Sequence, residues 1–334
     1  MKKSLLFFAV LLLINFHLSE RCISATSADQ APTLRVLDSA DVPGKWLVLS
    51  NRNVSQPEIE HPYILKEGKM VKLAPDHAFL NAATWSPSGH KILASQPGDP
   101  ISFLRIYNEE GSLLETIETN RFSIGFDWID ENRIVYSDGW TSDNEEGHVI
   151  LFDLQSKEKK ILCKMPYKYE ASDLRVSPDK TKLIFNVNPI LSARNQFMPK
   201  TILINLETLK LKEIDMIAGL AGWLPDSKSV IVLTNWQADK SKINDRFGII
   251  ARFDTETGTM RRIKDSEGFY RVATLSRDGR YIYYARSTSD GSVAAFIQSL
   301  EMPHEWQITR PSDSTITDIP TSWLPDPNKD LLPA

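Results

Sequence analysis

Short apolar runs recur along the chain, and each begins a few residues after a single large apolar residue and a group of turn-forming residues. Hydrophobic and polar positions do not alternate within these runs, which is typical of strands packed on both faces. The clearest runs are Lys91-Ile92-Leu93-Ala94, Arg133-Ile134-Val135-Tyr136, Lys182-Leu183-Ile184-Phe185, Val230-Ile231-Val232-Leu233 and Tyr281-Ile282-Tyr283-Tyr284. Helical periodicity is hard to find after residue 28. The pattern predicts an all-β fold.

The residues before each run form a repeat. An apolar anchor is followed by Pro, Asp and Gly or Asn, which are the residues of a tight turn. The anchors are Trp85, Trp128, Val176, Trp223, Leu275 and Trp323, and consecutive anchors lie 43 to 52 residues apart. More polar segments that read as a third and a fourth strand complete each unit, as at residues 149–152 and 260–263. A period of this length is typical of the four-stranded blades of a β-propeller.

The two ends of the chain complement each other. Residues 46–49, 63–65 and 70–73 read as the second, third and fourth strands of a blade that lacks its first strand. The chain ends shortly after the sixth anchor, Trp323, and no further strands follow it. Joining the two ends completes one blade and removes the exposed sheet edges of an open ring. We therefore expect residues 29–334 to form one domain, a six-bladed β-propeller closed by pairing of its N- and C-terminal segments.

The turns carry a resemblance to a known family. Ser177-Pro178-Asp179 and Ser86-Pro87 match a Ser-Pro-Asp-Gly turn well, and Leu224-Pro225-Asp226 and Ser276-Arg277-Asp278-Gly279 match it in part. Ile129-Asp130-Glu131-Asn132 departs most from it. Over residues 45–334 the chain resembles the TolB-like propellers, whose WD40-like blades carry this turn between their first two strands. The resemblance implies the propeller fold but says little about an activity, because the motif is structural.

The first 28 residues read as a signal peptide. Lys2 and Lys3 precede an apolar run from Leu5 to Phe16, and small residues follow around Ala28. The run is shorter than the roughly 20 apolar residues that a membrane-spanning helix needs. We expect an exported protein, periplasmic or secreted, with no membrane span. Once Cys22 is removed, Cys163 is the remaining cysteine, so no disulfide within the chain is expected.

Composition narrows the possible functions. The chain is 42% hydrophobic and 25% charged, with a formal net charge of −4, which argues against a nucleic-acid partner. It contains no Gly-x-Ser-x-Gly nucleophile motif and no glycine-rich phosphate loop. None of the histidines pairs at the close spacing of a zinc motif, so we expect no cofactor and no metal. Histidines from different blades could still converge, as they do in propeller lyases that act on pectin fragments.

Two groups of residues are candidates for binding. The first strand of each blade lines the channel of a propeller, and Asp127, Asp173, Arg175, Arg271 and Asp318 fall on or beside these strands. Long loops between second and third strands, with Trp140, Arg194, Phe197 and Trp236, place aromatic side chains near charges. The alternatives are that the channel residues pair with one another and that Trp140 and Trp236 pack against neighbouring loops.

Antiparallel strands place these long loops and the connections between blades on one face of the ring, opposite the Pro-Asp-Gly turns. The predicted site therefore lies on that face, at the channel mouth. Its residues are Trp140, Asp173, Arg175, Arg194, Phe197, Trp236 and Arg271. We expect a non-enzymatic scaffold that binds another envelope or extracellular protein, or a carbohydrate. The alternative is a carbohydrate-active enzyme, such as a polysaccharide or oligosaccharide lyase, with its site at the channel mouth.

The signal peptide leads to a first prediction. The mature protein should begin near Asp29, because Ala28 ends the stretch of small residues after the apolar run. N-terminal sequencing of protein isolated from the envelope or the medium measures this directly. Intact protein in the cytoplasm, or membrane-bound protein that retains Met1, would contradict the expectation.

Overall fold

A computed structural model describes the chain in segments. The described residues are 33–36, 44–50, 61–66, 69–73, 80, 82–98, 101–120, 125–139, 146–165, 169–189, 199–214, 216, 218–234, 249–265, 273–288, 292–301, 304–309 and 318–324. Within these ranges the regular elements are β-strands, and no helix long and apolar enough to cross a membrane is found.

The strands form six sheets, which we number as blades 1 to 6 in chain order. Blade 1 contains Ala82–Trp85 (β5), Lys91–Gln96 (β6), Ile101–Asn108 (β7) and Leu113–Asn120 (β8). Blade 2 contains Phe126–Asp130 (β9), Arg133–Asp138 (β10), Gly147–Asp153 (β11) and Lys159–Met165 (β12). Blade 3 contains Tyr169–Val176 (β13), Lys182–Pro189 (β14), Lys200–Asn205 (β15) and Leu211–Ile214 (β16).

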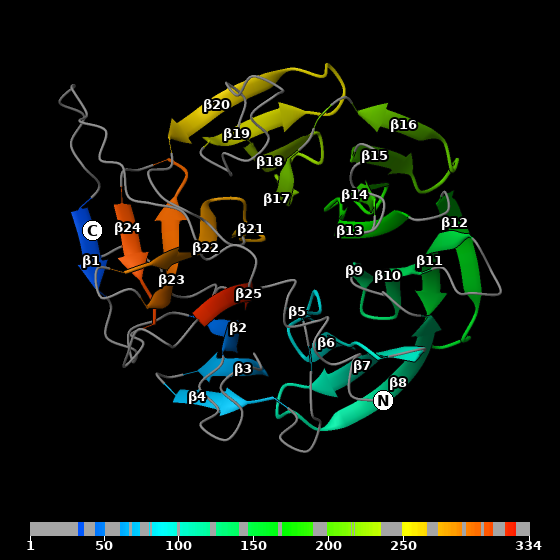
Figure 1. Ribbon diagram of the computed structural model, residues 1–334, viewed down its shortest axis with the longest axis horizontal. Coiled ribbons are helices and arrows are strands. Elements are labelled where there is room, and N and C mark those ends of the chain that lie inside the picture. The colour runs from blue at the N-terminus through cyan, green and yellow to red at the C-terminus, as the bar shows by residue number, and fades with distance from the viewer. Residues whose placement is uncertain are drawn as a thin grey trace.

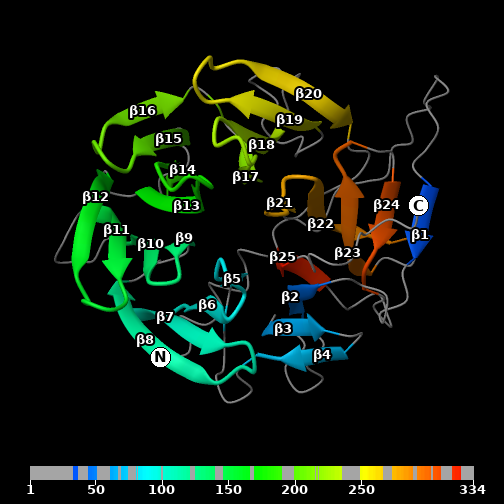
Figure 2. The same cartoon turned by 180° about the vertical axis from the view of Figure 1, so that it is seen from behind.

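The remaining strands form the other half of the ring. Blade 4 contains Gly219–Trp223 (β17), Ser229–Thr234 (β18), Ile249–Asp254 (β19) and Met260–Asp265 (β20). Blade 5 contains Ala273–Leu275 (β21), Tyr281–Ser287 (β22), Val293–Ser299 (β23) and His304–Gln307 (β24). Blade 6 contains Asp318–Leu324 (β25), Lys45–Ser50 (β2), His61–Lys66 (β3) and Lys69–Lys72 (β4). Figures 1 and 2 show the blades arranged around a central axis, with β5, β9, β13, β17, β21 and β25 nearest to it.

Blade 6 closes the ring as the sequence predicts. Strand β25 pairs antiparallel with β2, from Lys45 opposite Leu324 to Ser50 opposite Asp318. Strand β25, from the C-terminal part of the chain, therefore supplies the first strand of a blade whose other strands come from the N-terminal part. The prediction of six four-stranded blades closed by the two ends is confirmed.

One strand was not predicted. Residues Thr33–Val36 (β1) pair parallel with β24 and add a fifth strand to blade 5. This strand occupies the outer edge of the blade, where the backbone groups of β24 would otherwise have no strand partner. Four residues are too few to show a strand pattern in the sequence. Their position also depends on the outer edge of β24, a strand near the other end of the chain.

The apolar residues form a separate core between each pair of neighbouring blades. Trp46 packs with Tyr283 and Trp306 between blades 6 and 5, whereas the next residue, Leu47, packs with Trp85 between blades 6 and 1. Both are almost fully buried, with exposed fractions of 1% and 0%. The same division holds at the other four interfaces. The second strands are therefore buried on both faces, which explains why their sequences do not alternate.

The Ser-Pro-Asp-Gly turns are held by their own side chains. The backbone N–H of Lys182 donates to Ser177 Oγ at 2.9 Å, and that hydroxyl donates to Asp179 Oδ1 at 2.6 Å. Ser276 and Asp278 repeat the arrangement. The fourth turn position has positive φ at Gly89, Lys180, Ser227 and Gly279. Asn132, in the corresponding turn of blade 2, does not have a positive φ, because β9 and β10 are joined by a shorter connection of two residues. These contacts are structural, as expected of the motif.

Ring closure leads to the second prediction. Deleting residues 316–334 removes β25, so β2 loses one of its two pairing partners and the strands of blades 5 and 1 that contact β25 lose part of their cover. We expect aggregation or loss of most of the roughly 5–15 kcal/mol that stabilises a typical domain.

Urea unfolding followed by tryptophan fluorescence measures the effect. The matched control deletes residues 325–334, which leaves β25 intact and should preserve cooperative unfolding. If the longer deletion unfolds at the same urea concentration as the full chain, the composite blade is wrong.

Candidate functional site

The structure describes two of the seven residues that the sequence singled out. Asp173 and Arg175 both lie on β13, the first strand of blade 3. Trp140, Arg194, Phe197, Trp236 and Arg271 lie outside the described residues. Their part in binding stays a prediction.

Asp173 sits at an irregularity of β13. The register between β13 and β14 shifts between Ser172 and Arg175, and Asp173 has a positive φ of 52°. Its Oδ2 accepts a hydrogen bond from Asn186 Nδ2 at 3.1 Å, and the same amide donates to the carbonyl of Ala218 at 2.8 Å. A non-glycine residue in this conformation is strained. Here a hydrogen-bonded link to the segment before blade 4 holds the carboxylate in place.

Arg175 lies closer to the Pro-Asp-Gly turns than to the long loops, because β13 ends at Val176 and the turn begins at Ser177. Its Nη1 donates to the carbonyl of Leu174 at 2.9 Å, while its buried Nε has no hydrogen-bond partner among the described residues. The backbone carbonyl of Arg175 accepts from the indole Nε1 of Trp223 at 2.8 Å. The residue therefore joins blades 3 and 4 and retains one unsatisfied donor.

Asp127 on β9 faces Arg175 from the neighbouring blade. Its Oδ1 accepts from the backbone N–H of Trp128 and its Oδ2 from that of Val176, both at 2.8 Å. The second bond ties blade 2 to blade 3. Burial raises the pKa of Asp127 above its usual range, although Arg175, the two backbone donors and Arg277 oppose the shift. Both carboxylate oxygens of Asp127 therefore accept backbone hydrogen bonds, which gives the side chain a structural role.

Arg277 extends from the Ser276-Arg277-Asp278-Gly279 turn of blade 5 towards blade 1. Its guanidinium donates to the carbonyls of Pro87 and Trp85, the latter at 3.2 Å, and thereby bypasses blade 6. It also interacts electrostatically with Asp127 of blade 2. Asp127, Arg175 and Arg277, which we call the axial cluster, therefore bring blades 2, 3 and 5 together at the Pro-Asp-Gly end of the channel and join them to blade 1.

The axial cluster carries two guanidinium groups and one carboxylate, so its formal charge is positive. Such a set can hold blades in register and can attract a carboxylate or another acceptor entering the channel. It does not provide a metal site: within the described segments, no three His, Cys, Asp or Glu side chains gather closely enough to hold an ion. Cys163 is half-buried and burial raises its thiol pKa, the opposite of what an activated thiol requires.

The role of Arg277 was not predicted from the sequence. The signal was present, because Arg277 stands where Pro87, Pro178 and Pro225 stand in other turns. Because the turn forms with proline at this position in other blades, an arginine there suggests a contact outside the turn. The link from Arg277 to blade 1 nevertheless depends on ring closure, which brings residues about 190 positions apart into contact.

The axial cluster leads to the third prediction. Replacing Arg277 by alanine removes two hydrogen bonds to blade 1 and one of the two cations near Asp127, which should cost about 1–3 kcal/mol at pH 7. The folded-state pKa of Asp127 already lies above its unfolded value of 3.8, and losing a cation raises it further. The stability that a raised carboxyl pKa contributes is present at acidic pH and is lost as pH rises through that pKa. The cost of Arg277→Ala should therefore be smaller at pH 4 than at pH 7.

Urea unfolding at both pH values measures the difference. Lys200→Ala is the control, since Lys200 forms an exposed ion pair with Glu213 and its loss should change stability little. An equal loss for Arg277→Ala at both pH values would show that Asp127 does not sense this guanidinium.

Comparison with known proteins identifies the architecture. No sequence-family model matches the chain, and no curated protein sequence matches it significantly. Among solved structures, TolB from Acinetobacter baumannii matches with a TM-score of 0.60 at 12% identity, over 86% of this chain and 68% of that one. A structure described as TolB from Agrobacterium tumefaciens matches with a TM-score of 0.53 at 13% identity, over 85% of this chain and 99% of that one.

A prolyl endopeptidase structure also matches, with a TM-score of 0.50 at 14% identity, over 84% of this chain but 44% of that one. At these identities the similarity concerns the fold. The matches to TolB structures and the six blades agree with the resemblance that the turns carry. The chain therefore folds as a six-bladed β-propeller of the TolB-like type.

Proposed function

We propose that this propeller is a non-enzymatic scaffold, exported from the cytoplasm, that binds another protein of the envelope or the cell exterior. The partner binds on the face that carries the connections between second and third strands, which we call the loop face. The opposite face, with the Pro-Asp-Gly turns, we call the turn face. Antiparallel pairing within every blade separates the two sets of connections in this way.

The observation that carries this proposal is the position of Arg277. Its side chain joins blade 5 to the carbonyls of Trp85 and Pro87 in blade 1, beside Asp127 of blade 2, at the turn-face end of the channel. Because side chains of several blades meet at that end, we expect a partner segment to reach the channel from the loop face. There it would meet Asp173 first and the axial cluster further in.

The scaffold itself supports such a role. Six packed interblade cores make a rigid ring, and variable loops on a rigid scaffold are where binding residues are usually found. The long loops of this face carry Trp140, Arg194, Phe197 and Trp236, and Arg271 precedes the first strand of blade 5. Aromatic and arginine side chains dominate the energy of many protein interfaces.

A capture experiment tests the proposal. The mature protein, carrying an affinity tag, is cross-linked in its native envelope, and captured proteins are identified by mass spectrometry. Trp140→Ala combined with Trp236→Ala should weaken binding of the captured partner at least about tenfold, as expected for interface anchors, with little change in melting temperature.

The matched control is Arg252→Ala, on an exposed ion pair outside the proposed surface, which should leave affinity unchanged. A large fall in melting temperature for the tryptophan variant would show that these rings are structural. Unchanged affinity would place the interface elsewhere. Release of shortened oligosaccharides from an envelope polysaccharide would instead support a lyase.

A further inference from the structure

Charged side chains at two equivalent positions of the blades join blades 1 and 2 and blades 3 and 4 on the turn face. The first position is the first residue of the second strand, and the second lies seven residues after the end of the third strand. Between blades 3 and 4 both positions are used: Lys182 Nζ donates to the carbonyl of Ser227 and Lys212 Nζ to that of Thr255, each at 3.0 Å. This interface is bridged twice.

The interface between blades 1 and 2 is also bridged at both positions. Lys91 Nζ donates to the carbonyl of Glu131 at 2.9 Å. At the second position Glu115 forms an ion pair with Lys157 of blade 2. The residue types differ from those between blades 3 and 4, but each side chain again reaches the neighbouring blade.

The interface between blades 2 and 3 has neither bridge. Arg133, at the first position, turns back to Asp130 of its own blade, with Nε and Nη2 at 2.9 and 2.6 Å from Oδ2. Lys160, at the second position, has no hydrogen-bond or ion-pair partner among the described residues. A third cation, Lys180, lies on the blade 3 side, where it interacts electrostatically with Asp130.

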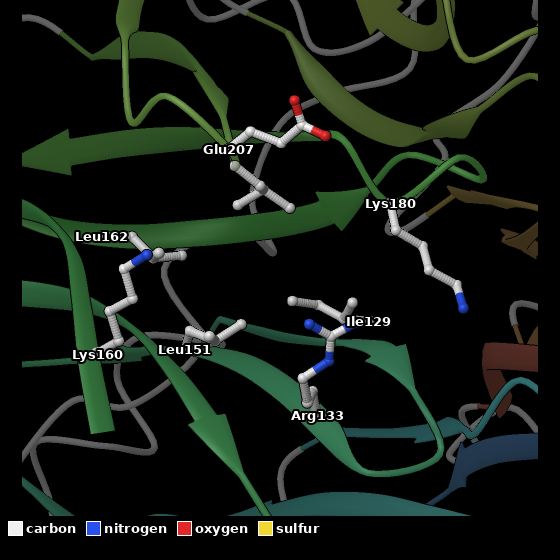
Figure 3. Close-up of a pocket in the computed structure, with 8 residues that line it drawn as sticks. Ile129, Arg133, Leu151, Lys160, Leu162, Lys180 and Glu207 are labelled. Atoms are coloured by element: carbon white, nitrogen blue, oxygen red, sulfur yellow. The ribbon is translucent and has the colours of Figure 1, made fainter. Parts of the chain in front are cut away.

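A hollow of about 280 Å³ opens where the two bridges are missing. Its apolar lining consists of Ile129, Leu151, Leu162 and Leu206, which belong to or pack against the core between blades 2 and 3. Its polar lining consists of Arg133, Lys160, Lys180 and Glu207. Figure 3 shows Lys160 and Lys180 on opposite sides of the hollow, with the carboxylate of Glu207 pointing away from Arg133. Lys160 and Lys180 thus flank an apolar floor, Arg133 is paired with Asp130 beside it, and the carboxylate of Glu207 lies at the rim.

Lys180 occupies a position that the turn would fill better with glycine. Its φ is 62°, and the corresponding residues in blades 1 and 5 are Gly89 and Gly279. A side chain in this conformation costs of order 1 kcal/mol per residue relative to glycine. The turn therefore tolerates strain at the residue that adds a positive charge to the hollow.

We propose that this hollow binds a small organic anion in which a carboxylate adjoins a branched apolar group, such as an apolar amino-acid residue with a free α-carboxylate. The leucine and isoleucine side chains of the floor cover the apolar group, and Lys160, which has no hydrogen-bond or ion-pair partner among the described residues, attracts the carboxylate together with Lys180. The volume lies near the lower limit of ligand pockets, which suits one residue rather than a larger ligand. The site lies on the turn face and is independent of the loop-face interface proposed above.

Isothermal titration with N-acetyl-leucine tests the proposal on the full mature chain. We expect saturable binding that weakens as salt rises, because the attraction is partly electrostatic. N-acetyl-leucinamide, which lacks the carboxylate, and acetate, which lacks the apolar group, should each bind at least about tenfold more weakly. Equal binding of N-acetyl-leucine and N-acetyl-leucinamide would overturn the proposal.

Two variants separate binding from folding. Lys180→Gly removes a cation but relieves the turn, so it should raise the melting temperature while weakening N-acetyl-leucine binding about three- to tenfold. Lys160→Gln should weaken binding to a similar extent with little change in stability. Unchanged affinity in both variants would overturn the proposal, whatever their stability.

Lys212→Gln is the matched control. It alters the equivalent position between blades 3 and 4, where the ammonium group is bonded to Thr255, so it should lower stability without changing N-acetyl-leucine affinity. A short peptide that ends in leucine distinguishes the sources of the ligand. If it binds as tightly as N-acetyl-leucine, the site accepts protein C-termini; if only N-acetyl-leucine binds, the site takes a free acid.

Discussion

Each blade depends on its two neighbours, because both faces of its sheet are apolar. Successive residues of one strand, such as Trp46 and Leu47, enter different interblade cores and are almost completely buried. An open ring of such sheets would expose two apolar faces to water, at a free-energy cost that grows with their area. Pairing of β25 with β2 is therefore the contact on which the rest of the structure depends.

Closure of the ring also creates the channel and its polar lining. Asp127, Arg175 and Arg277 belong to three blades, and hydrogen bonds to the backbone join them or their neighbours to other blades. Burying charges is unfavourable unless they are paired and hydrogen-bonded. In a closed ring the two oxygens of Asp127 and the guanidinium of Arg277 find such partners, so the electrostatics of the axial cluster and the assembly of the blades depend on each other.

On the turn face, residues at equivalent positions of the repeat make different contacts in different blades. Lys182 and Lys212 bridge blades 3 and 4, whereas Arg133 and Lys160, at the same repeat positions, do not bridge blades 2 and 3. The difference begins with Asp130, which binds Arg133 within its own blade, and with the short connection that follows it. A change within one turn thus leaves a charged hollow at one interface, while the neighbouring interfaces remain bridged.

The sequence by itself determined the fold, because every blade repeats the same local signals. The apolar anchor, the Ser-Pro-Asp-Gly turn and the doubly buried second strand each depend on neighbours within a few residues. These local patterns did not predict β1, because its pairing partner β24 lies about 270 residues away in the sequence. Of the site, the sequence placed Asp127, Asp173 and Arg175 on first strands, which follows from the repeat. Only the tertiary structure decided that Arg277 reaches Trp85 and that Lys160 finds no hydrogen-bond or ion-pair partner among the described residues, because such contacts depend on distances between blades that the local pattern does not encode.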